Sequence, residues 1–369
     1  FEFIDILKEA GATLWQILPL NPPAYGDSPY SSDSVFAGNS LLIDPGGLIN
    51  LGLIRGNRVN SLPHKPGKVD FQSVKLFKFQ LFRDAFNEFV NGSFHELSSD
   101  FDRFLANQAS WINDYALFRV AKDIHGGLPW FQWPEPLKQR DSSALTTLAN
   151  ENADSINYQC FVQFLFFHQW KCLKEKARES GIRIIGDMPL FVAMDSADVW
   201  ANPHSFQLDT NLDPIDVAGV PPDYFSATGQ LWGNPLYDWD RMKDDGFQWW
   251  KDRFKVLLNQ VDIVRIDHFR GFESYWAIPE NEETAVNGCW VKGPGRSFFK
   301  KVISELGPLD IIAEDLGEIT PEVIALRQSL GFPGMKVLQF AFDHNPGNPF
   351  LPNNYHDRFC VVYTGTHDN

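Results

Sequence analysis

Four acidic residues stand where short apolar runs of the sequence turn polar: Asp187, Asp267, Glu314 and Asp368. Closely spaced apolar residues before each acid are typical of a strand that is buried on both faces of a parallel sheet. Because the carboxyl ends of parallel strands meet at one edge, we expect these acids to converge. Paired carboxylates with no cluster of His and Cys at metal-ligand spacing indicate glycosidic chemistry, in which one carboxyl is a nucleophile and the other an acid that later becomes the base.

Neighbouring charges predict which carboxyl takes which role. Arg265 precedes Asp267 by two residues, so both side chains share one strand face, and the cation favours the ionised form that suits a nucleophile. Glu314 is expected near the other carboxylates, with no cation close to it in sequence. Like-charge repulsion would then raise the pKa of Glu314 and keep it protonated as the acid.

The remaining polar residues at these strand ends have supporting roles in this hypothesis. Asp368 is expected to stabilise the positive charge of an oxocarbenium-like transition state. His268 and His367 are expected to bind sugar hydroxyls. Any one of these residues could equally be a salt-bridge or capping residue, and the argument for chemistry depends on their occurring together at converging strand ends.

The rest of the chain must supply the elements that position these acids. Apolar runs near residues 15, 185, 264, 312, 338 and 362 predict six strands, and helical patterns separate them. This alternation is the layout of an α/β protein of the (β/α)8 barrel type. A closed barrel needs two more strands, and we expect one before Phe1 and one after Asn369. An open doubly wound sheet is the alternative, but no Gly-rich phosphate-binding turn follows any of the strands.

A long helical stretch interrupts the alternation. Apolar residues at i, i+3 and i+4 spacing recur in the segments Val74–Val90, Phe101–Ala106, Ser110–Ala121 and Tyr158–Arg178. We therefore expect a mainly helical insertion over residues 43–179. The partial barrel is expected over residues 1–42 and 180–369.

Two polar segments rich in Gly and Pro are predicted to be loops. Residues 25–39 contain Ser, Asp and Tyr as well, which fits either plain turns or a binding loop at a strand end. Residues 219–239 combine prolines, glycines and five large aromatic side chains. Long ordered loops of this kind are more often lids or binding walls than simple connections.

Composition excludes several classes of function. The 369 residues carry a net charge of −15, which argues against a nucleic-acid partner. The sequence contains no apolar run of membrane-spanning length. Its four cysteines form no CxxC pair and are expected to be free thiols in a reducing compartment. We therefore predict a cytoplasmic location, or a plastid one if the source is a plant, and the oligomeric state is left open.

Seven segments carry a family resemblance. RIDHFRG (265–271), AEDLG (313–317) and TGTHDN (364–369) resemble the catalytic segments of the α-amylase clan in its 4-α-glucanotransferase form. Four more segments resemble the amylomaltases, or disproportionating enzymes: SPYSS (28–32), GDMPLFVAMDSADVW (186–200), PPDYFSATGQLWGNPLY (221–237) and GFPGMKVLQFAF (331–342). The resemblance runs nearly from end to end and implies a (β/α)8 barrel.

The resemblance also implies a reaction and its residues. It implies that α-1,4-glucan segments pass between maltodextrins through a covalent glycosyl-enzyme, without a cofactor or metal. Asp267 would be the nucleophile, Glu314 the acid/base and Asp368 the transition-state stabiliser. The residues that would line the donor sugar site are Asp187, Arg265, His268 and His367. Those in segments resembling glucan-binding loops are Tyr30, Asp223, Tyr224, Gln230 and Trp232.

Three other interpretations stay open at this point. An α-1,4-glucan hydrolase of the amylase type would use the same carboxylates with water as the acceptor. A non-catalytic barrel would bind glucan through its aromatic residues alone. A divalent metal would need the donor set Asp187, Asp267, His268 and His367.

Overall fold

A computed structural model of the protein describes residues 1–59, 67–223, 226–355 and 357–367. The chain divides into two compact units, and each unit is assembled from three separate stretches of sequence. Unit 1 consists of Phe1–Ile6, Leu20–Ser180 and Val192–Pro203. Unit 2 consists of Leu7–Pro19, Gly181–Phe191 and His204–Asn369.

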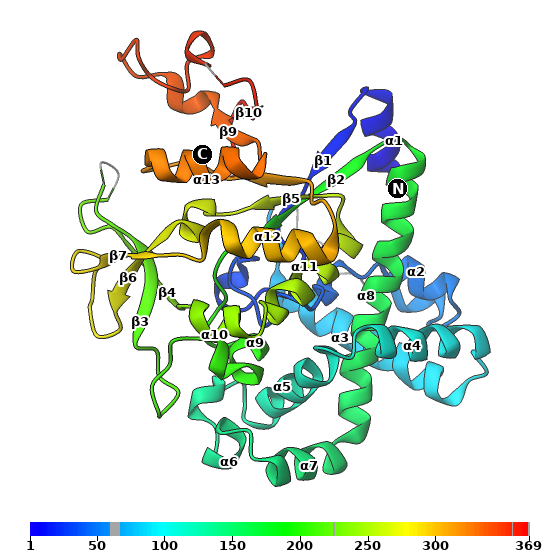
Figure 1. Ribbon diagram of the computed structural model, residues 1–369. Helices are drawn as coiled ribbons and strands as arrows, with labels where there is room; N and C mark the ends of the chain where they lie inside the picture. Colours follow the sequence, from blue (N-terminus) through cyan, green and yellow to red (C-terminus); the bar gives the residue numbers. More distant parts are fainter. Residues whose placement is uncertain (60–66, 224–225, 356, 368–369) are drawn as a thin grey trace. The chain divides into compact units, whose positions relative to one another are not determined.

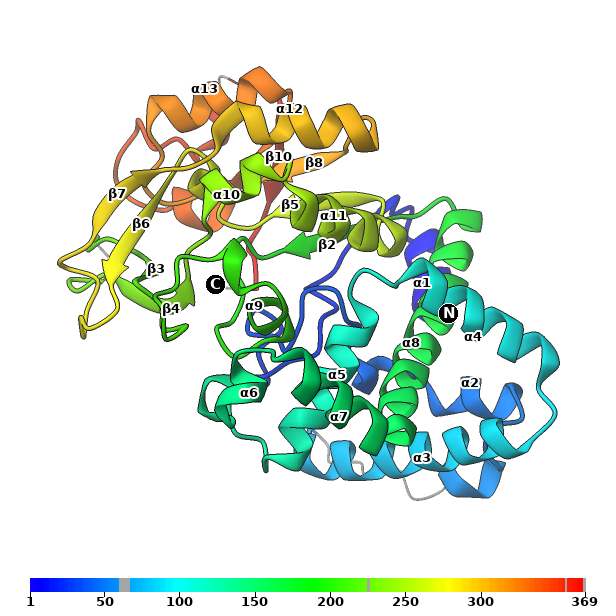
Figure 2. The same ribbon diagram turned by 60° about the horizontal axis from the view of Figure 1, so that its bottom comes forward.

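Unit 1 is helical and is built around the long helix α8 (Figures 1 and 2). Its helices are α2 (Pro45–Asn50), α3 (Phe71–Asn91), α4 (His95–Asn107), α5 (Ile112–Ile124), α6 (Glu135–Lys138), α7 (Ser142–Glu151), α8 (Ala153–Glu179) and α9 (Ala197–Ala201), while α1 (Glu2–Glu9) passes from unit 1 into unit 2. Helix α8 contacts α3, α4, α5 and α7. The core at these contacts is strongly aromatic, with Phe82 and Phe161 fully buried. Three of the four helical segments predicted from apolar spacing lie within α3, α4 and α8, and the fourth, Ser110–Ala121, begins two residues before α5.

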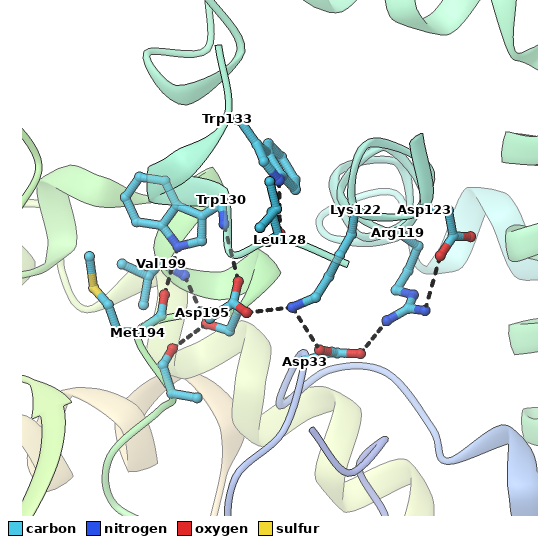
Figure 3. A network of polar contacts seen from close by, with 12 residues as sticks. Asp33, Arg119, Lys122, Asp123, Leu128, Trp130, Trp133, Met194, Asp195 and Val199 are labelled. Atoms are coloured by element: carbon cyan, nitrogen blue, oxygen red, sulfur yellow. Dashed lines mark hydrogen bonds and ion pairs between the residues drawn. The ribbon is translucent and has the colours of Figure 1, made fainter. Parts of the chain in front are cut away.

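A network of charged side chains joins α5 to two loops of unit 1 (Figure 3). Arg119 forms an ion pair with Asp33, in the loop that precedes α2. Lys122, one turn further along α5, pairs with Asp195 in the loop that precedes α9 and lies 3.7 Å from Asp33. The other carboxylate oxygen of Asp195 accepts a hydrogen bond of 3.2 Å from the backbone of Trp130. One helix therefore holds both loops through buried or half-buried charges.

The main feature of unit 2 is a set of six parallel strands that matches the six predicted strands. Four of them form one sheet in the order β1 (Leu14–Gln16), β2 (Arg183–Met188), β5 (Ile263–Ile266) and β8 (Ile311–Ala313). The other two, β9 (Gly334–Val337) and β10 (Cys360–Tyr363), also pair in parallel. The two sets are joined where the backbone N–H of Ala313 donates to the carbonyl of Pro333 at 2.9 Å.

The strands follow one another as in a barrel, but those described form an arc and not a closed ring. The edge strands β1 and β10 nevertheless approach each other at their carboxyl ends. There the Tyr363 hydroxyl donates a 2.7 Å hydrogen bond to the Gln16 side chain. The helices between the strands are α10 (Trp239–Asp244), α11 (Gln248–Gln260), α12 (Gly295–Leu306) and α13 (Pro321–Leu330).

The segment 219–239 is not the long loop predicted from its composition. Residues on both sides of the undescribed positions 224 and 225 form strands β3 (Asp216–Val220) and β4 (Gln230–Pro235), which pair in antiparallel fashion. With β6 (Ser274–Pro279) and β7 (Cys289–Lys292) they make a second, antiparallel sheet. The glycines that suggested a loop serve close strand contact, because a Cβ at Gly219 would lie 2.3 Å from the carbonyl oxygen of Gln230.

One predicted strand differs in extent. The strand predicted near residue 338 is β9, which ends at Val337, and Leu338–Ala341 form a 3₁₀ helix. Helix α13 has Pro321 in its first turn and is ended by Gly331, whose φ is 71°. The four cysteines are free thiols, as predicted.

Candidate active site

The polar site lies one layer above an apolar cluster on the parallel strands. Ile185, Ile263, Ile312 and Met335 pack together and are nearly inaccessible to solvent. Side chains two residues apart in a strand share a face. The next layer toward the carboxyl ends therefore contains Asp187, Arg265 and Glu314, with Asp267 two residues beyond Arg265. Burial of the isoleucines fixes the direction of the polar side chains above them.

Arg265 is the cation at the centre of this layer. Its Nη1 lies 2.6 Å from Asp187 Oδ1 and 3.0 Å from Asp267 Oδ1. The side chain of Asp187 is 1% exposed and that of Asp267 is 31% exposed, so only the second carboxylate is open to a ligand. Burial by itself would lower the pKa of Arg265, but the carboxylates of Asp187 and Asp267 raise it overall. The guanidinium therefore stays charged between two acids.

Glu314 is half-buried and held by backbone N–H groups. Its Oε2 accepts a 2.8 Å hydrogen bond from the amide of His268, and its Oε1 accepts one of 2.7 Å from the amide of Leu316. Since His268 follows Asp267 directly, the Glu314 carboxyl lies against the backbone beside the other acid. Burial first and Asp267 second raise the pKa of Glu314, Arg265 and the two amides oppose the shift, and the resulting pKa is about 7.

The reason for this shift differs in part from the one argued from the sequence. That argument relied on neighbouring carboxylates alone and assumed that no cation was close. In the structure desolvation is the larger cause, and Arg265 is near enough to reduce the effect. The direction of the shift is nevertheless the one predicted from the sequence.

His268 connects the acids to the antiparallel sheet. Its backbone is left-handed, with φ 54°, as the chain turns away from β5. Its ring packs edge to face with Trp232 of β4, with centroids 4.9 Å apart. Burial first and Arg270 second lower the pKa of His268 to about 3, so the ring is neutral. Its buried Nε2 has no hydrogen-bond partner among the described residues.

The aromatic wall beside His268 contains two of the predicted binding residues. Trp232 is 38% exposed, and its indole N–H donates a 3.0 Å hydrogen bond to the side-chain oxygen of Gln230. Asp223 lies in the turn after β3, where its Oδ1 accepts a 2.8 Å hydrogen bond from the Ser226 amide. This carboxylate thus shapes the turn of the β3–β4 hairpin.

Other predicted residues are not brought to the acids by the contacts described. Tyr30 belongs to unit 1, where it lies in a turn of the loop before α2. His367 is exposed in the turn after β10. Asp368 and Tyr224 lie outside the described residues, so their predicted roles stay predictions.

Sequence reasoning missed the pair Tyr363 and Gln16 at the edges of the strand arc. Besides their mutual hydrogen bond, Tyr363 is close enough to Asp187 and Arg265 for both to affect its titration. Burial raises the pKa of the Tyr363 phenol, Arg265 lowers it and Asp187 raises it. The available signal was the position of Tyr363 at the end of a strand, directly before the TGTHDN segment.

Two further observations bear on the alternatives. Within residues 1–59, 67–223, 226–355 and 357–367, no group of three or more His, Cys, Asp or Glu side chains is arranged to hold a metal ion. In the same part of the chain, no helix combines the length and apolar character needed to cross a bilayer.

The geometry offers one carboxylate beside a cation, one half-buried carboxyl with a pKa near neutrality, and an exposed indole next to a neutral imidazole. An ionised acid can attack an electrophilic carbon, and a protonated acid can donate to a leaving oxygen. Flat aromatic faces and unpartnered polar atoms fit a sugar. This combination fits a glycosidic site in which one carboxyl attacks and the other donates a proton.

Comparisons with known proteins agree with this chemistry. A family model described as 4-alpha-glucanotransferase matches residues 1–369. The 4-alpha-glucanotransferase of Thermus thermophilus is 51% identical over all of this chain and 73% of its own length, and that of Synechocystis sp. is 48% identical over all of this chain and 74% of its own.

Two solved amylomaltase structures have the same fold as this chain. An amylomaltase from Streptococcus agalactiae, in complex with acarbose, matches all of this chain and 74% of its own with a TM-score of 0.95 and 38% identity. This likeness confirms an α/β fold of the (β/α)8 class. Amylomaltase from Corynebacterium glutamicum shares the fold with a TM-score of 0.75, at 18% identity over 99% of this chain and 51% of its own. Family model, relatives and fold together show that the chain belongs to the 4-alpha-glucanotransferase family of glycosyltransferases.

Proposed function

We propose that this 4-alpha-glucanotransferase works by retaining double displacement with Asp267 as nucleophile and Glu314 as acid/base. Protonated Glu314 donates its proton to the glycosidic oxygen while the Asp267 carboxylate attacks the anomeric carbon. The carbon–oxygen bond of the donor breaks, and a covalent glycosyl-enzyme forms. Glu314, now ionised, takes the proton from an acceptor hydroxyl, which attacks the same carbon and releases Asp267.

The observation that carries this proposal is the unequal environment of the two acids. Asp267 is partly exposed and lies 3.0 Å from a guanidinium that favours its ionised form. Glu314 is half-buried and its pKa is raised to about 7, mainly by desolvation, so an acid that gives and retakes a proton near neutral pH is available. Two titratable groups with environments that favour opposite protonation states are the pattern expected of such a pair.

The proposal extends to the substrate and to Asp368. Substrates would be α-1,4-glucans, in line with the acarbose bound by the Streptococcus agalactiae amylomaltase. Sugar rings would stack on Trp232, and the Nε2 of His268 would meet a sugar hydroxyl. The residues that would complete the binding surface are Gln230, Asp223, Tyr224, Tyr30 and His367. The buried Asp187 would act on the sugar site through its ion pair with Arg265, and Asp368 would stabilise the oxocarbenium-like transition state.

The predicted domain division and location also belong to this proposal. Residues 1–42 and 180–369 would carry the reaction as the barrel, with residues 43–179 inserted into it. The cytoplasmic location rests on the free thiols. Two plant relatives, from Solanum tuberosum and Arabidopsis thaliana, have the words chloroplastic/amyloplastic in their names, which supports a plastid location for a plant source.

Incubation of the full-length protein with maltotriose tests the reaction. Transfer yields glucose together with dextrins longer than maltotriose. Glucose and maltose alone, with no longer product, would identify a hydrolase instead.

Matched variants test the assignment of the nucleophile. Asp267→Asn is expected to lower kcat by on the order of 10³-fold or more. The control is Asp310→Asn, whose carboxylate is 64% exposed and precedes β8 at the opposite end of the sheet, and it should keep wild-type transfer. Equal rates for Asp267→Asn and wild type would overturn the assignment.

A further inference from the structure

Asp315, the acidic residue that follows Glu314, has no part in the proposed reaction. Its side chain is nevertheless held by a hydrogen bond and an ion pair. Consecutive residues of an extended chain point to opposite sides. Glu314 therefore faces the site, while Asp315 faces β9 and α13. The Asp315 side chain is 11% exposed, which is unusual for a carboxylate without a specific partner.

Two backbone features of β9 receive this carboxylate. The amide of Met335 donates a 2.7 Å hydrogen bond to Asp315 Oδ1. A Cβ at Gly334 would lie 2.4 Å from Asp315 Oδ2, closer than any real contact allows. The absence of a side chain at residue 334 thus leaves the space that the Asp315 carboxylate occupies.

A buried arginine pairs with Asp315 from the opposite side. The Nε of Arg327, on α13, lies 3.1 Å from Asp315 Oδ2, and the arginine side chain is 7% exposed. The same guanidinium donates to the carbonyl of Phe332 at 2.9 Å and lies 3.2 Å from the carboxylate of Asp357. Arg327 therefore connects the end of β8 with the starts of both β9 and β10.

This arrangement bears on Glu314 through the backbone. The Leu316 amide, which donates to Glu314 Oε1, lies on the far side of Asp315 in the chain. If residue 315 moved, the direction of that amide and the position of the Glu314 carboxyl would change together. We propose that Asp315 and Arg327 are positioning residues for the acid/base, holding the turn 314–316 so that the Leu316 and His268 amides both stay on the Glu314 carboxyl.

The inference rests on the proposed acid/base role of Glu314, so its test must separate the two. On the Glu314 side, the charged and titratable groups are Arg265 of β5, Asp267 and His268 directly after it, Asp187 of β2 and Tyr363 of β10. On the Asp315 side they are Arg327 of α13, Lys336 of β9, Cys360 of β10 and Asp357 before it. Of these groups, only Arg327 is substituted in the experiments that follow.

Two substitutions disturb the pair in different ways. Asp315→Asn keeps an oxygen for the Met335 amide but removes the charge that faces Arg327. Gly334→Ala keeps both charges and displaces the carboxylate by steric contact. In each variant we expect kcat for maltotriose transfer to fall about 10–100-fold, since misplacement of a reacting group by about 1 Å costs on that order, with KM changed less than about twofold.

The pH dependence of kcat gives a readout that a purely structural role would not change. A loosened turn admits water to Glu314, which reduces the desolvation that raises its pKa. The alkaline limb of the kcat profile should therefore move to lower pH in both variants. Arg327→Lys, which keeps the charge but not the planar fork, should show a smaller shift than Asp315→Asn.

Lys251→Met provides the matched control. Lys251 of α11 is also 7% exposed and forms a 2.7 Å ion pair with Glu305 of α12, away from any strand end that carries a site residue. It should lower thermal stability while leaving kcat and the alkaline limb unchanged.

The outcomes separate the inference from the proposed function. Wild-type kcat and an unmoved alkaline limb in both Asp315→Asn and Gly334→Ala would overturn the positioning role, even if both variants melt at lower temperature. Transfer at the wild-type rate by Glu314→Gln would overturn the acid/base assignment and, with it, the inference. Loss in Glu314→Gln together with shifted limbs in both positioning variants supports both.

Discussion

At the scale of single residues, Arg265 determines the charge around the proposed nucleophile. It lies between the fully buried Asp187 and the partly exposed Asp267, at 2.6 and 3.0 Å. A buried carboxylate whose cation is removed becomes an uncompensated buried charge, which is strongly unfavourable. The same arginine also opposes the raised pKa of Glu314.

We therefore expect Arg265→Met to impair transfer and to change its pH dependence. The ionised form of Asp267 loses its nearest cation, so the acid limb of the kcat/KM profile should move to higher pH. Arg183→Met is the control, because Arg183 stands at the opposite end of β2 and its side chain is 51% exposed. An acid limb at the wild-type position in Arg265→Met would contradict this account.

A second prediction concerns Glu314 and stability. Its pKa is about 7 in the folded protein against an ordinary value of 4.5, so the folded state binds this proton more tightly than the unfolded state. The resulting stability is fully present below about pH 4.5 and is lost as the pH rises through about 7. Urea unfolding should therefore show that Glu314→Gln gains stability relative to wild type between pH 5 and pH 8, by on the order of a few kcal/mol. Parallel stability curves would rule out the raised pKa.

Residue types and spacing were sufficient to predict that Asp187, Arg265, Asp267 and Glu314 lie together. The period of two in strands places them on one face, and the apolar residues two positions earlier mark which face that is. The burial of Glu314 was not predictable in this way, because desolvation depends on packing from His268 and other distant segments. Asp315 and Arg327 escaped notice for the same reason: their contacts join residues from three different elements.

At the scale of elements, α5 carries charges that hold two loops of unit 1 (Figure 3). Arg119→Met would remove the nearest cation from Asp33, whose side chain is 9% exposed, and leave it Lys122 at 3.7 Å. We expect the free energy of unfolding, measured by chemical denaturation, to fall by about 2–3 kcal/mol. Breaking a fully buried ion pair costs about 3–5 kcal/mol, and the cost is smaller here because the Arg119 side chain is 23% exposed.

An exposed pair of the same helical unit offers the comparison. Arg103→Met on α4 removes an ion pair with Asp100 in which both side chains are largely exposed. Its effect should stay within about 0.5 kcal/mol. Equal losses for Arg103→Met and Arg119→Met would mean that the α5 network contributes no more than a surface pair.

Elements whose apolar residues recur at a regular helical spacing were predicted well. Strands that contain Gly and Pro were not. Helices α3, α5 and α8 have long runs with apolar residues on one side, and local spacing alone identifies them. Strands β3 and β4 contain Gly and Pro, which predict a loop. Strand β3 also pairs with β6, more than fifty residues further along the chain, and no local pattern reports such a partner.

At the scale of the whole molecule, both units are discontinuous in sequence. The alternation of strands and helices was enough to predict the fold class, because a parallel sheet needs a crossover between its strands. That residues 192–203 belong to unit 1 was not predictable from their sequence. They join it through contacts with α5, such as the ion pair between Lys122 and Asp195.

The pairing of β1 with β2 has a consequence for how the protein is made. Leu14 pairs with Arg183, so about 170 residues must be synthesised before the partner of β1 exists. At about 5–20 residues per second, a ribosome takes on the order of 10 s or more over that distance. Most of unit 1 emerges in this interval, and its helices depend on local contacts that form quickly. Ribosome-bound chains stalled before residue 183 should therefore show protected amides in α3 and α5, but no protection in β1 that depends on its pairing with β2.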